Sequence, residues 1–105
     1  LQHRLRRALT LTRTRVKRFE DISFIEPDGA FYCFFSIRGL TDSLAFAHAL
    51  LDQTKVGLAP GLAFGPAGEG YLRLCYAQDE QILNKAFDRL DKGFNAVRRS
   101  LIEDK

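Results

Sequence analysis

The residue with the clearest chemical potential in this sequence is Arg73, which lies in the apolar segment YLRLCYA at residues 71–77. The alternation predicts a strand with Leu72 and Leu74 on one face and Arg73 on the other. A guanidinium in such a strand needs a partner, because desolvating it without one costs several kcal/mol. The partner could be structural, either an internal acid such as Glu69 or solvent at a sheet edge. Alternatively, it could be a bound anionic ligand.

A glycine-rich segment, GLAFGPAGEG at residues 61–70, leads directly into this strand. Four glycines in ten residues predict backbone at positive φ or in close approach to another group. Open backbone beside a strand arginine favours a pocket for a small anion. The segment lacks the Lys-Ser or Lys-Thr ending of a P-loop and precedes a strand rather than a helix, so we do not expect a P-loop.

Other residue types that could do chemistry lack the right neighbours. His3 and His48 have no cysteine or acidic neighbours at metal-ligand spacing, so no metal site is predicted. Cys33 and Cys75 lie in apolar runs without CxxC spacing, which predicts reduced, buried thiols. No serine triad is visible, and the lysines lie in polar or boundary contexts rather than in the desolvated surroundings of a Schiff-base lysine. We therefore predict no catalytic residue within this chain.

The elements that must position Arg73 follow from the hydrophobic pattern. A strand at 30–37 carries apolar residues on both faces, which predicts a place in the middle of a sheet that is covered on both sides. FEDISFIEP, at 19–27, alternates only weakly before a turn at Pro27, Asp28 and Gly29. The predicted order is helix, strand, helix, strand, strand, helix, an α+β arrangement of helices on a small sheet. After the Arg-rich opening helix, its elements are a strand at 30–37, a helix at 41–54, a short strand at 55–60, a strand at 71–77 and a helix from Asp79.

Helix limits and inward faces are also predicted. Thr41, Asp42 and Ser43 offer N-caps for the second helix, and Asp79 offers one for the last. The predicted apolar positions are Leu44, Ala47, Leu50 and Leu51 in the second helix, and Ile82, Leu83, Ala86, Phe87, Leu90, Phe94, Val97 and Leu101 in the last.

The chain has 105 residues, 46% hydrophobic and 28% charged, an ordinary balance for a single globular domain. That balance excludes a disordered or collagen-like chain. No window approaches the ~20 consecutive apolar residues that span a bilayer, and the first segment is too polar for a signal sequence. We therefore expect a cytoplasmic protein with no membrane partner.

Positive charge is concentrated at the start of the chain. Residues 1–20 carry seven basic side chains and one acidic, whereas the remainder holds nine basic and twelve acidic. One interpretation is a patch for nucleic acid or another anionic surface. The favoured one is the solvated face of a helix. Apolar and small residues recur at helical spacing on the opposite side, namely Leu1, Leu5, Ala8 or Leu9, and Thr12, and no aromatic residue interleaves the arginines before Phe19.

Three segments together resemble a known family. PDGAFYCFFSI at 27–37, VGLAPGLAFG at 56–65 and GEGYLRLCYA at 68–77, followed by a long amphipathic helix, resemble the C-terminal small domain of class I/II aminotransferases. These are the fold type I pyridoxal-phosphate enzymes related to aspartate aminotransferase. The resemblance implies one α+β domain over residues 1–105, with a small mixed or antiparallel sheet of three to four strands covered by helices. It also implies that the large cofactor-binding domain is absent and that the parent enzyme is a cytoplasmic homodimer.

The resemblance also implies substrate-binding residues. Arg73 stands where the family's arginine grips the α-carboxylate of the amino-acid substrate, and Phe31 stands where an aromatic residue approaches the same site, with Tyr32 beside it. The residues expected in the loop near the substrate are Pro60, Gly61, Phe64 and Gly65. Transamination requires the Cα–H bond to stand perpendicular to the cofactor ring, and a bidentate arginine fixes that angle by fixing the carboxylate plane. Arg73 is thus expected to position the substrate as the domain closes over the active site, and not to carry a proton.

By the same resemblance, the parent enzyme uses pyridoxal 5'-phosphate and transfers an amino group between an amino acid and a 2-oxo acid. The Schiff-base lysine, the acid that protonates the pyridine nitrogen and the phosphate-binding residues are expected upstream of residue 1. The 105-residue chain alone is therefore expected to bind no cofactor and to be inactive, as the last portion of a longer enzyme.

Two alternatives belong to other functional classes. GAFYCFF after a basic arm is faintly similar to the aromatic strand motif of RNA-recognition domains, which suggests an RNA-binding module. Against it, Asp28 stands where that motif has Lys or Arg, and no specific nucleic-acid partner is expected. The second alternative is a structural or dimer-forming domain in which Phe31, Tyr71 and Phe64 are only core residues.

Overall fold

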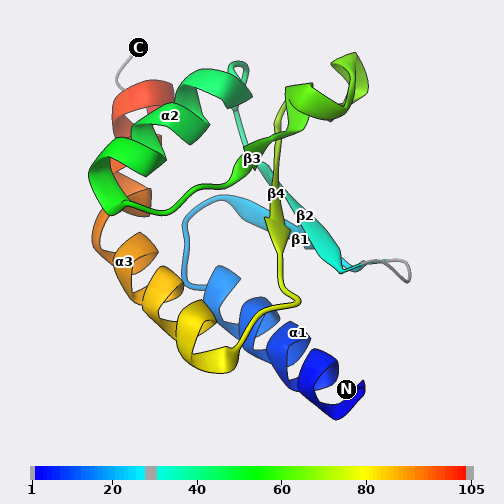
Figure 1. The fold of residues 1–105 in the computed structure, drawn as a ribbon. Helices are drawn as coiled ribbons and strands as arrows, with labels where there is room; N and C mark the ends of the chain where they lie inside the picture. Colours follow the sequence, from blue (N-terminus) through cyan, green and yellow to red (C-terminus); the bar gives the residue numbers. More distant parts are fainter. Residues whose placement is uncertain (1, 28–30, 104–105) are drawn as a thin grey trace.

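A computed structural model describes residues 2–27 and 31–103 as a single α+β unit (Figure 1). The described part contains a four-stranded sheet and three α-helices, which confirms the predicted fold class. Asp28 and Gly29 of the predicted turn, and Leu1, lie outside the described residues. The elements are α1 Gln2–Val16, β1 Ile22–Ile25, β2 Tyr32–Ile37, α2 Ser43–Thr54, β3 Ala59–Pro60, the 3₁₀ turns η1 Gly61–Phe64 and η2 Pro66–Gly68, β4 Tyr71–Cys75, α3 Glu80–Arg98 and a π-helical segment Arg99–Glu103.

The sheet has the strand order β1-β2-β4-β3, and each pair of neighbours is antiparallel. Strand β1 was missing from the predicted element order, because four residues of weak alternation give little sequence signal. The strand predicted over 55–60 is wrong for its first four residues, and only Ala59–Pro60 pairs with β4. Lys55 instead ends α2 in the left-handed conformation, with φ +62° and its N–H donating to the Leu51 carbonyl. Because β2 and β4 are the interior strands, Arg73 does not lie on a sheet edge.

Local capping fixes where α2 and α3 begin. The Asp42 carboxylate accepts a hydrogen bond from the Ala45 N–H at 3.0 Å, and the Asp79 carboxylate accepts one from Gln81 at 2.8 Å. Of the three residues predicted as possible caps of α2, Asp42 is the N-cap, and Asp79 caps α3 as predicted. Such caps satisfy N–H groups that have no partner within the helix.

Three predicted core positions on the helices are wrong. The buried stripe of α2 is Ser43, Phe46, Ala47, Leu50 and Thr54, whereas Leu44 and Leu51 are exposed. Each lies one residue, about 100° around the helix, beyond a buried position, so it falls on the flank of the stripe. Ile82 on α3 is exposed next to buried Leu83 for the same reason.

The three α-helices lie on one side of the sheet, and no α-helix of the described residues lies over its other face (Figure 1). Cys33, Phe35 and Ile37 of β2 point into the core with Leu72 and Leu74 of β4. The alternate residues of β2 are half-buried or exposed. The prediction that β2 is covered on both faces is thus wrong within the described residues. The uncovered side, which we call the open face, carries the apolar residues that suggested a second covering layer.

Helix α1 is not simply a solvated basic helix. Arg15 is only 6% exposed and donates to Asp88 and Asp91 of α3 at 2.8 Å each. Arg7, Arg13 and Arg18 also form ion pairs, with Glu80, Glu26 and Asp91 respectively. The prediction of a solvated basic face is therefore wrong for Arg15, because this residue lies beside the buried Thr12 and Val16 and meets a carboxylate pair one turn apart on α3. Among the helices that the structure describes, none is both long and apolar enough to cross a bilayer.

Candidate functional site

Arg73 lies at the centre of the open face. It is half-buried on β4, opposite Phe34 of β2 and Ala59 of β3. Directly paired residues of neighbouring strands share a face of the sheet, so all three side chains project away from the helices. The alternation predicted for residues 71–77 is confirmed over β4, which ends at Cys75, with Leu72 and Leu74 buried on the other side.

Two aromatic rings flank the Arg73 guanidinium. Its Cζ atom lies 4.0 Å from the centroid of Tyr32 on β2 and 4.1 Å from the centroid of Phe64 at the end of η1. Such distances favour attraction between a cation and the negative face of each ring. Within residues 2–27 and 31–103, no carboxylate comes within ion-pair distance of Arg73.

Glu69, the internal acid that could have neutralised Arg73, is held elsewhere. Its carboxylate accepts a hydrogen bond of 2.5 Å from the backbone N–H of Ser43, in the first turn of α2. A carboxylate is stabilised at a helix N-terminus by the free amides and the helix dipole. The alternative in which Glu69 pairs with Arg73 is therefore wrong, and the guanidinium keeps its hydrogen-bond donors for solvent or a ligand.

The 61–70 loop is built from two short 3₁₀ turns that touch each other through glycines. A Cβ atom on Gly61 would lie 1.9 Å from the Gly68 carbonyl oxygen, and one on Gly68 would lie 2.1 Å from the Gly61 carbonyl oxygen. Gly65 and Gly70 adopt φ of +114° and +96°. Both predicted reasons for the glycines, close approach and positive φ, are thus confirmed.

Ser43 anchors this loop to helix α2. Its buried hydroxyl accepts a hydrogen bond of 3.2 Å from the N–H of Leu62, while its own N–H reaches Glu69. One residue therefore fixes both η1 and the segment after η2. The sequence suggested Ser43 only as a helix cap, since no local signal shows a contact across 19 and 26 residues.

The structure brings together some of the predicted site residues. Arg73, Tyr32 and Phe64 meet on the open face, and Pro60, Gly61 and Gly65 form the adjoining loop. Phe31 lies just before β2, half exposed, with its carbonyl accepting the Tyr76 N–H, and it is not one of the rings on Arg73.

Phe34 is a residue that the site prediction missed. Its ring meets Phe64 edge-on, with centroids 5.8 Å apart and an interplanar angle of 90°. Its position two residues after Tyr32 was the available signal, because alternate strand residues share a face.

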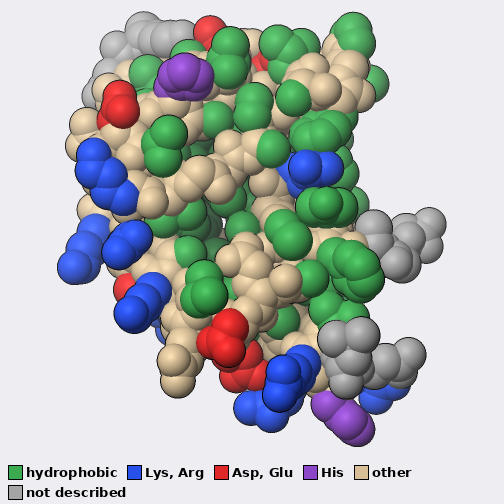
Figure 2. All heavy atoms as spheres, viewed as in Figure 1, with side chains coloured by type: hydrophobic (Ala, Val, Ile, Leu, Met, Phe, Trp, Pro, Cys, Tyr) green, Lys and Arg blue, Asp and Glu red, His purple; other side chains and the backbone are tan. Residues whose placement is uncertain are grey.

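Apolar side chains surround Arg73 on the open face. Figure 2 shows hydrophobic side chains gathered on the side of the molecule that carries the strands. Ile25, Tyr32 and Phe64 are all exposed large hydrophobic residues. A single guanidinium among apolar groups can bind an anion in weakened competition with water, which suits a planar carboxylate.

The two cysteines are free thiols on opposite faces of the sheet. Cys33 faces the core, where burial raises its pKa to about 12. Cys75 lies on the open face, two residues after Arg73, and is half-buried. A thiol with a pKa this high is protonated and unreactive at neutral pH, so Cys33 is a structural residue.

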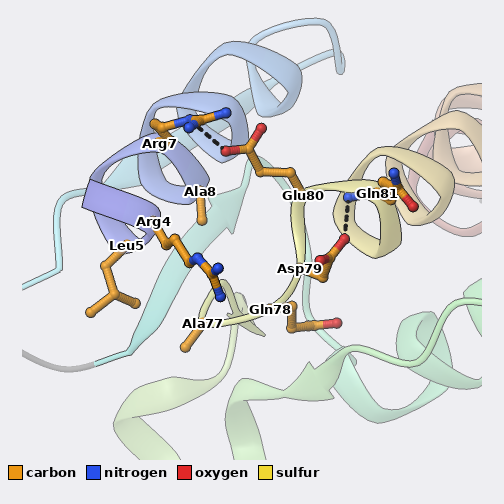
Figure 3. A pocket seen from close by; sticks show the side chains of 9 residues that line it. All are labelled: Arg4, Leu5, Arg7, Ala8, Ala77, Gln78, Asp79, Glu80 and Gln81. Carbon is orange, nitrogen blue, oxygen red and sulfur yellow. Dashed lines mark hydrogen bonds and ion pairs between the residues drawn. The ribbon is translucent and has the colours of Figure 1, made fainter. Parts of the chain in front are cut away.

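A separate pocket of about 500 Å³ lies between α1 and the start of α3 (Figure 3). Arg4 extends toward the Ala77–Gln78 segment, while Arg7 pairs with Glu80 at 2.8 Å. None of the residues predicted to bind substrate lines this pocket.

The lysines of the described residues do not fit a covalently held aldehyde cofactor. Lys17, Lys55, Lys85 and Lys92 are all exposed. A lysine that forms a Schiff base is activated by desolvation or by a neighbouring cation, and an exposed lysine is not desolvated. These residues therefore offer no anchor for such a cofactor.

Comparisons with known proteins identify the family of this chain. The family model for aminotransferase class I and II matches residues 1–90. An aspartate aminotransferase of Thermotoga maritima is 41% identical over 75 residues, covering 71% of this chain and 19% of that protein. An aspartate aminotransferase of Pyrococcus horikoshii is 42% identical over 85 residues, covering 80% and 22%.

Solved structures extend the similarity to three dimensions. The crystal structure of an aromatic aminotransferase from Pyrococcus horikoshii superposes with a TM-score of 0.81 at 33% identity, covering 90% of this chain and 25% of that one. The chain therefore belongs to the class I and II aminotransferase family, and not to the RNA-recognition domains considered as an alternative. It spans about a fifth of the length of the curated relatives it matches.

Proposed function

We propose that this chain is the C-terminal small domain of a pyridoxal-phosphate-dependent aminotransferase, and that Arg73 binds the α-carboxylate of the substrate. The observation that carries the proposal is the state of Arg73: a half-buried guanidinium on the open face, flanked by two rings, with no carboxylate partner among the described residues. The parent enzyme transfers an amino group between an amino acid and a 2-oxo acid, as a homodimer.

The cofactor belongs to the rest of that enzyme. The four lysines that the structure describes are exposed, so the 105-residue chain alone should neither bind pyridoxal phosphate covalently nor transaminate. The contribution of this domain is to bind and orient. A bidentate contact to the α-carboxylate fixes the carboxylate plane, which in turn fixes the Cα–H bond relative to the cofactor and lowers the entropic part of the barrier.

The domain's place in the parent sequence can be tested separately. The sequence immediately before Leu1 should hold a Schiff-base lysine motif followed by a glycine-arginine stretch. A start codon directly before Leu1, with no upstream domain, would contradict the placement while leaving the family membership intact.

The role of Arg73 is tested in the full-length enzyme. Arg73→Ala should lower kcat/KM for L-aspartate or L-phenylalanine, whichever is accepted, by about 30- to 5000-fold, which corresponds to about 2–5 kcal/mol for a hydrogen-bonded charge pair. KM should rise strongly and the half-reaction should slow, because the variant loses both the binding contact and the orientation of the Cα–H bond. Arg73→Lys should not restore the activity, because an ammonium cannot hold the carboxylate plane.

Two measurements make this test specific. The visible absorbance of the bound cofactor should be unchanged in Arg73→Ala, since the cofactor is held elsewhere. Arg89→Ala, which removes an exposed arginine of α3, is the matched loss of one positive charge and should leave kcat/KM unchanged. Equal kinetics for Arg73→Ala and Arg89→Ala would refute the assignment.

A further inference from the structure

The rings on either flank of Arg73 come from separate parts of the chain. Tyr32 belongs to β2, whereas Phe64 ends the η1 turn, nine residues before the arginine. Both are large exposed hydrophobic residues, at 40% and 46% exposure. Two aromatic side chains this exposed contribute little to the core, so their placement against one guanidinium calls for another explanation.

Aromatic rings restrict a guanidinium in a particular way. The five N–H donors of arginine lie in the guanidinium plane, while an aromatic ring is attracted to the flat face of the cation. Two rings at about 4 Å from Cζ attract the cation through their faces and do not use its in-plane N–H donors. They also restrict the rotamers of a long side chain before any ligand arrives, which lowers the entropy lost on binding.

Phe64 is itself held in place, although it is exposed. The ring of Phe34 meets it edge-on at 5.8 Å, and the N–H of Leu62 donates to the Ser43 hydroxyl at 3.2 Å. The Gly65 N–H donates to the Leu62 carbonyl at 3.1 Å and closes the turn. The 61–70 loop thus presents the Phe64 ring to Arg73 from a fixed base on α2.

We propose that Tyr32 and Phe64 are positioning residues, which hold the Arg73 guanidinium in the orientation that binds a planar carboxylate. They act through Arg73, so the 61–70 loop tunes affinity for the α-carboxylate without touching the reacting atoms. This inference rests on the proposed function of Arg73, and its test separates the two.

The test uses ring deletions in the full-length enzyme, with conservative variants as rescue. Phe64→Leu and Tyr32→Leu should each raise KM for the accepted amino acid by about 3- to 30-fold, the range expected for losing a cation–π contact, with kcat changed less than threefold. Phe64→Tyr and Tyr32→Phe keep a ring and should behave as the unaltered enzyme. Leu62→Ala removes an exposed apolar side chain from the same turn and is the matched control.

A substrate pair isolates the carboxylate. β-Alanine is L-aspartate without its α-carboxylate, and 2-phenylethylamine is the same for L-phenylalanine. The rate of reaction with β-alanine or 2-phenylethylamine, whichever the enzyme accepts, should be unaffected by Phe64→Leu. Binding is measured separately by calorimetry with α-methyl-L-aspartate or α-methyl-L-phenylalanine, which lack the Cα hydrogen, and the dissociation constant should rise by the same factor as KM.

The outcomes distinguish the two proposals. If Arg73→Ala raises KM but Phe64→Leu and Tyr32→Leu match Leu62→Ala, the positioning role is refuted and the role of Arg73 stands. If Arg73→Ala leaves the preference for the α-carboxylate intact, both proposals fail. Phe64→Leu should add less than twofold in the Arg73→Ala background, and a full additional loss there would show that Phe64 acts independently of Arg73.

Discussion

The contact between Gly61 and Gly68 gives the sharpest prediction about the 61–70 loop. In Gly61→Ala the new Cβ would lie 1.9 Å from the Gly68 carbonyl oxygen and 2.7 Å from the Tyr71 carbonyl oxygen. Both neighbours are backbone, so the clash cannot be relieved by a side-chain rotation, and the two 3₁₀ turns must move apart. Overpacking costs about 1–3 kcal/mol of stability and sometimes more. Replacing glycine by alanine also lowers the conformational entropy of the unfolded chain, which offsets about 0.4–1 kcal/mol of that cost. We expect a net loss of about 2 kcal/mol in the free energy of unfolding.

The matched control is Gly57→Ala. A Cβ at Gly57 would meet nothing within 4 Å, and Gly57 is not among the glycines at positive φ. It should therefore be neutral or stabilising by up to about 1 kcal/mol. Urea unfolding followed by far-ultraviolet circular dichroism measures both, since the chain contains no tryptophan for fluorescence. In the full-length enzyme, Gly61→Ala should also raise KM, because it displaces the turn that carries Phe64. Equal stability of the two variants would refute this account of the loop.

Two further predictions concern groups away from the loop. Hydrogen bonds from Arg99 and then Arg98 lower the pKa of Glu20. The stabilisation by Glu20 is thus fully present above its ordinary pKa of 4.5 and is lost as the pH falls through the lower folded-state pKa. In urea titrations from about pH 6 to pH 3, Glu20→Gln should lose stability less steeply than the unaltered chain, and parallel curves would contradict this prediction. Iodoacetamide should label Cys75 but not Cys33 in the folded chain, because burial raises the pKa of Cys33 to about 12, and peptide mass spectrometry showing equal labelling of both would disprove the assignment of faces.

Features that depend on neighbouring residues were predictable from the sequence. The caps of α2 and α3 at Asp42 and Asp79, and the alternation around Arg73, are set by side chains within four residues of the groups they affect. The glycine pattern likewise predicted both positive φ and close approach, since other residue types meet a steric penalty there.

Features that depend on distant contacts could not be read in advance. Arg15 can be buried because it pairs with Asp88 and Asp91, which lie more than seventy residues later in the sequence. Glu69 does not pair with Arg73 because its carboxylate accepts a hydrogen bond from the N–H of Ser43 at the start of α2. The sequence also did not predict that one face of the sheet lacks a covering helix, for a related reason. The alternating apolar residues of β2 indicate contact with other groups, but they do not say whether a helix of this chain or something else supplies that contact.

The other arginines of this chain support the proposal that Arg73 binds a ligand. Arg15 and Arg98 are buried, and each is neutralised by two or three carboxylates, as the cost of an unpaired buried charge demands. Arg73 has rings in place of acids. Rings attract the cation without competing for its N–H donors, whereas an internal carboxylate would occupy those donors and block a ligand. The chain gives each of its buried arginines two or three carboxylates, whereas Arg73 has none among the described residues and lies beside an anchored loop. This contrast supports the proposal that Arg73 binds an anion that comes from outside.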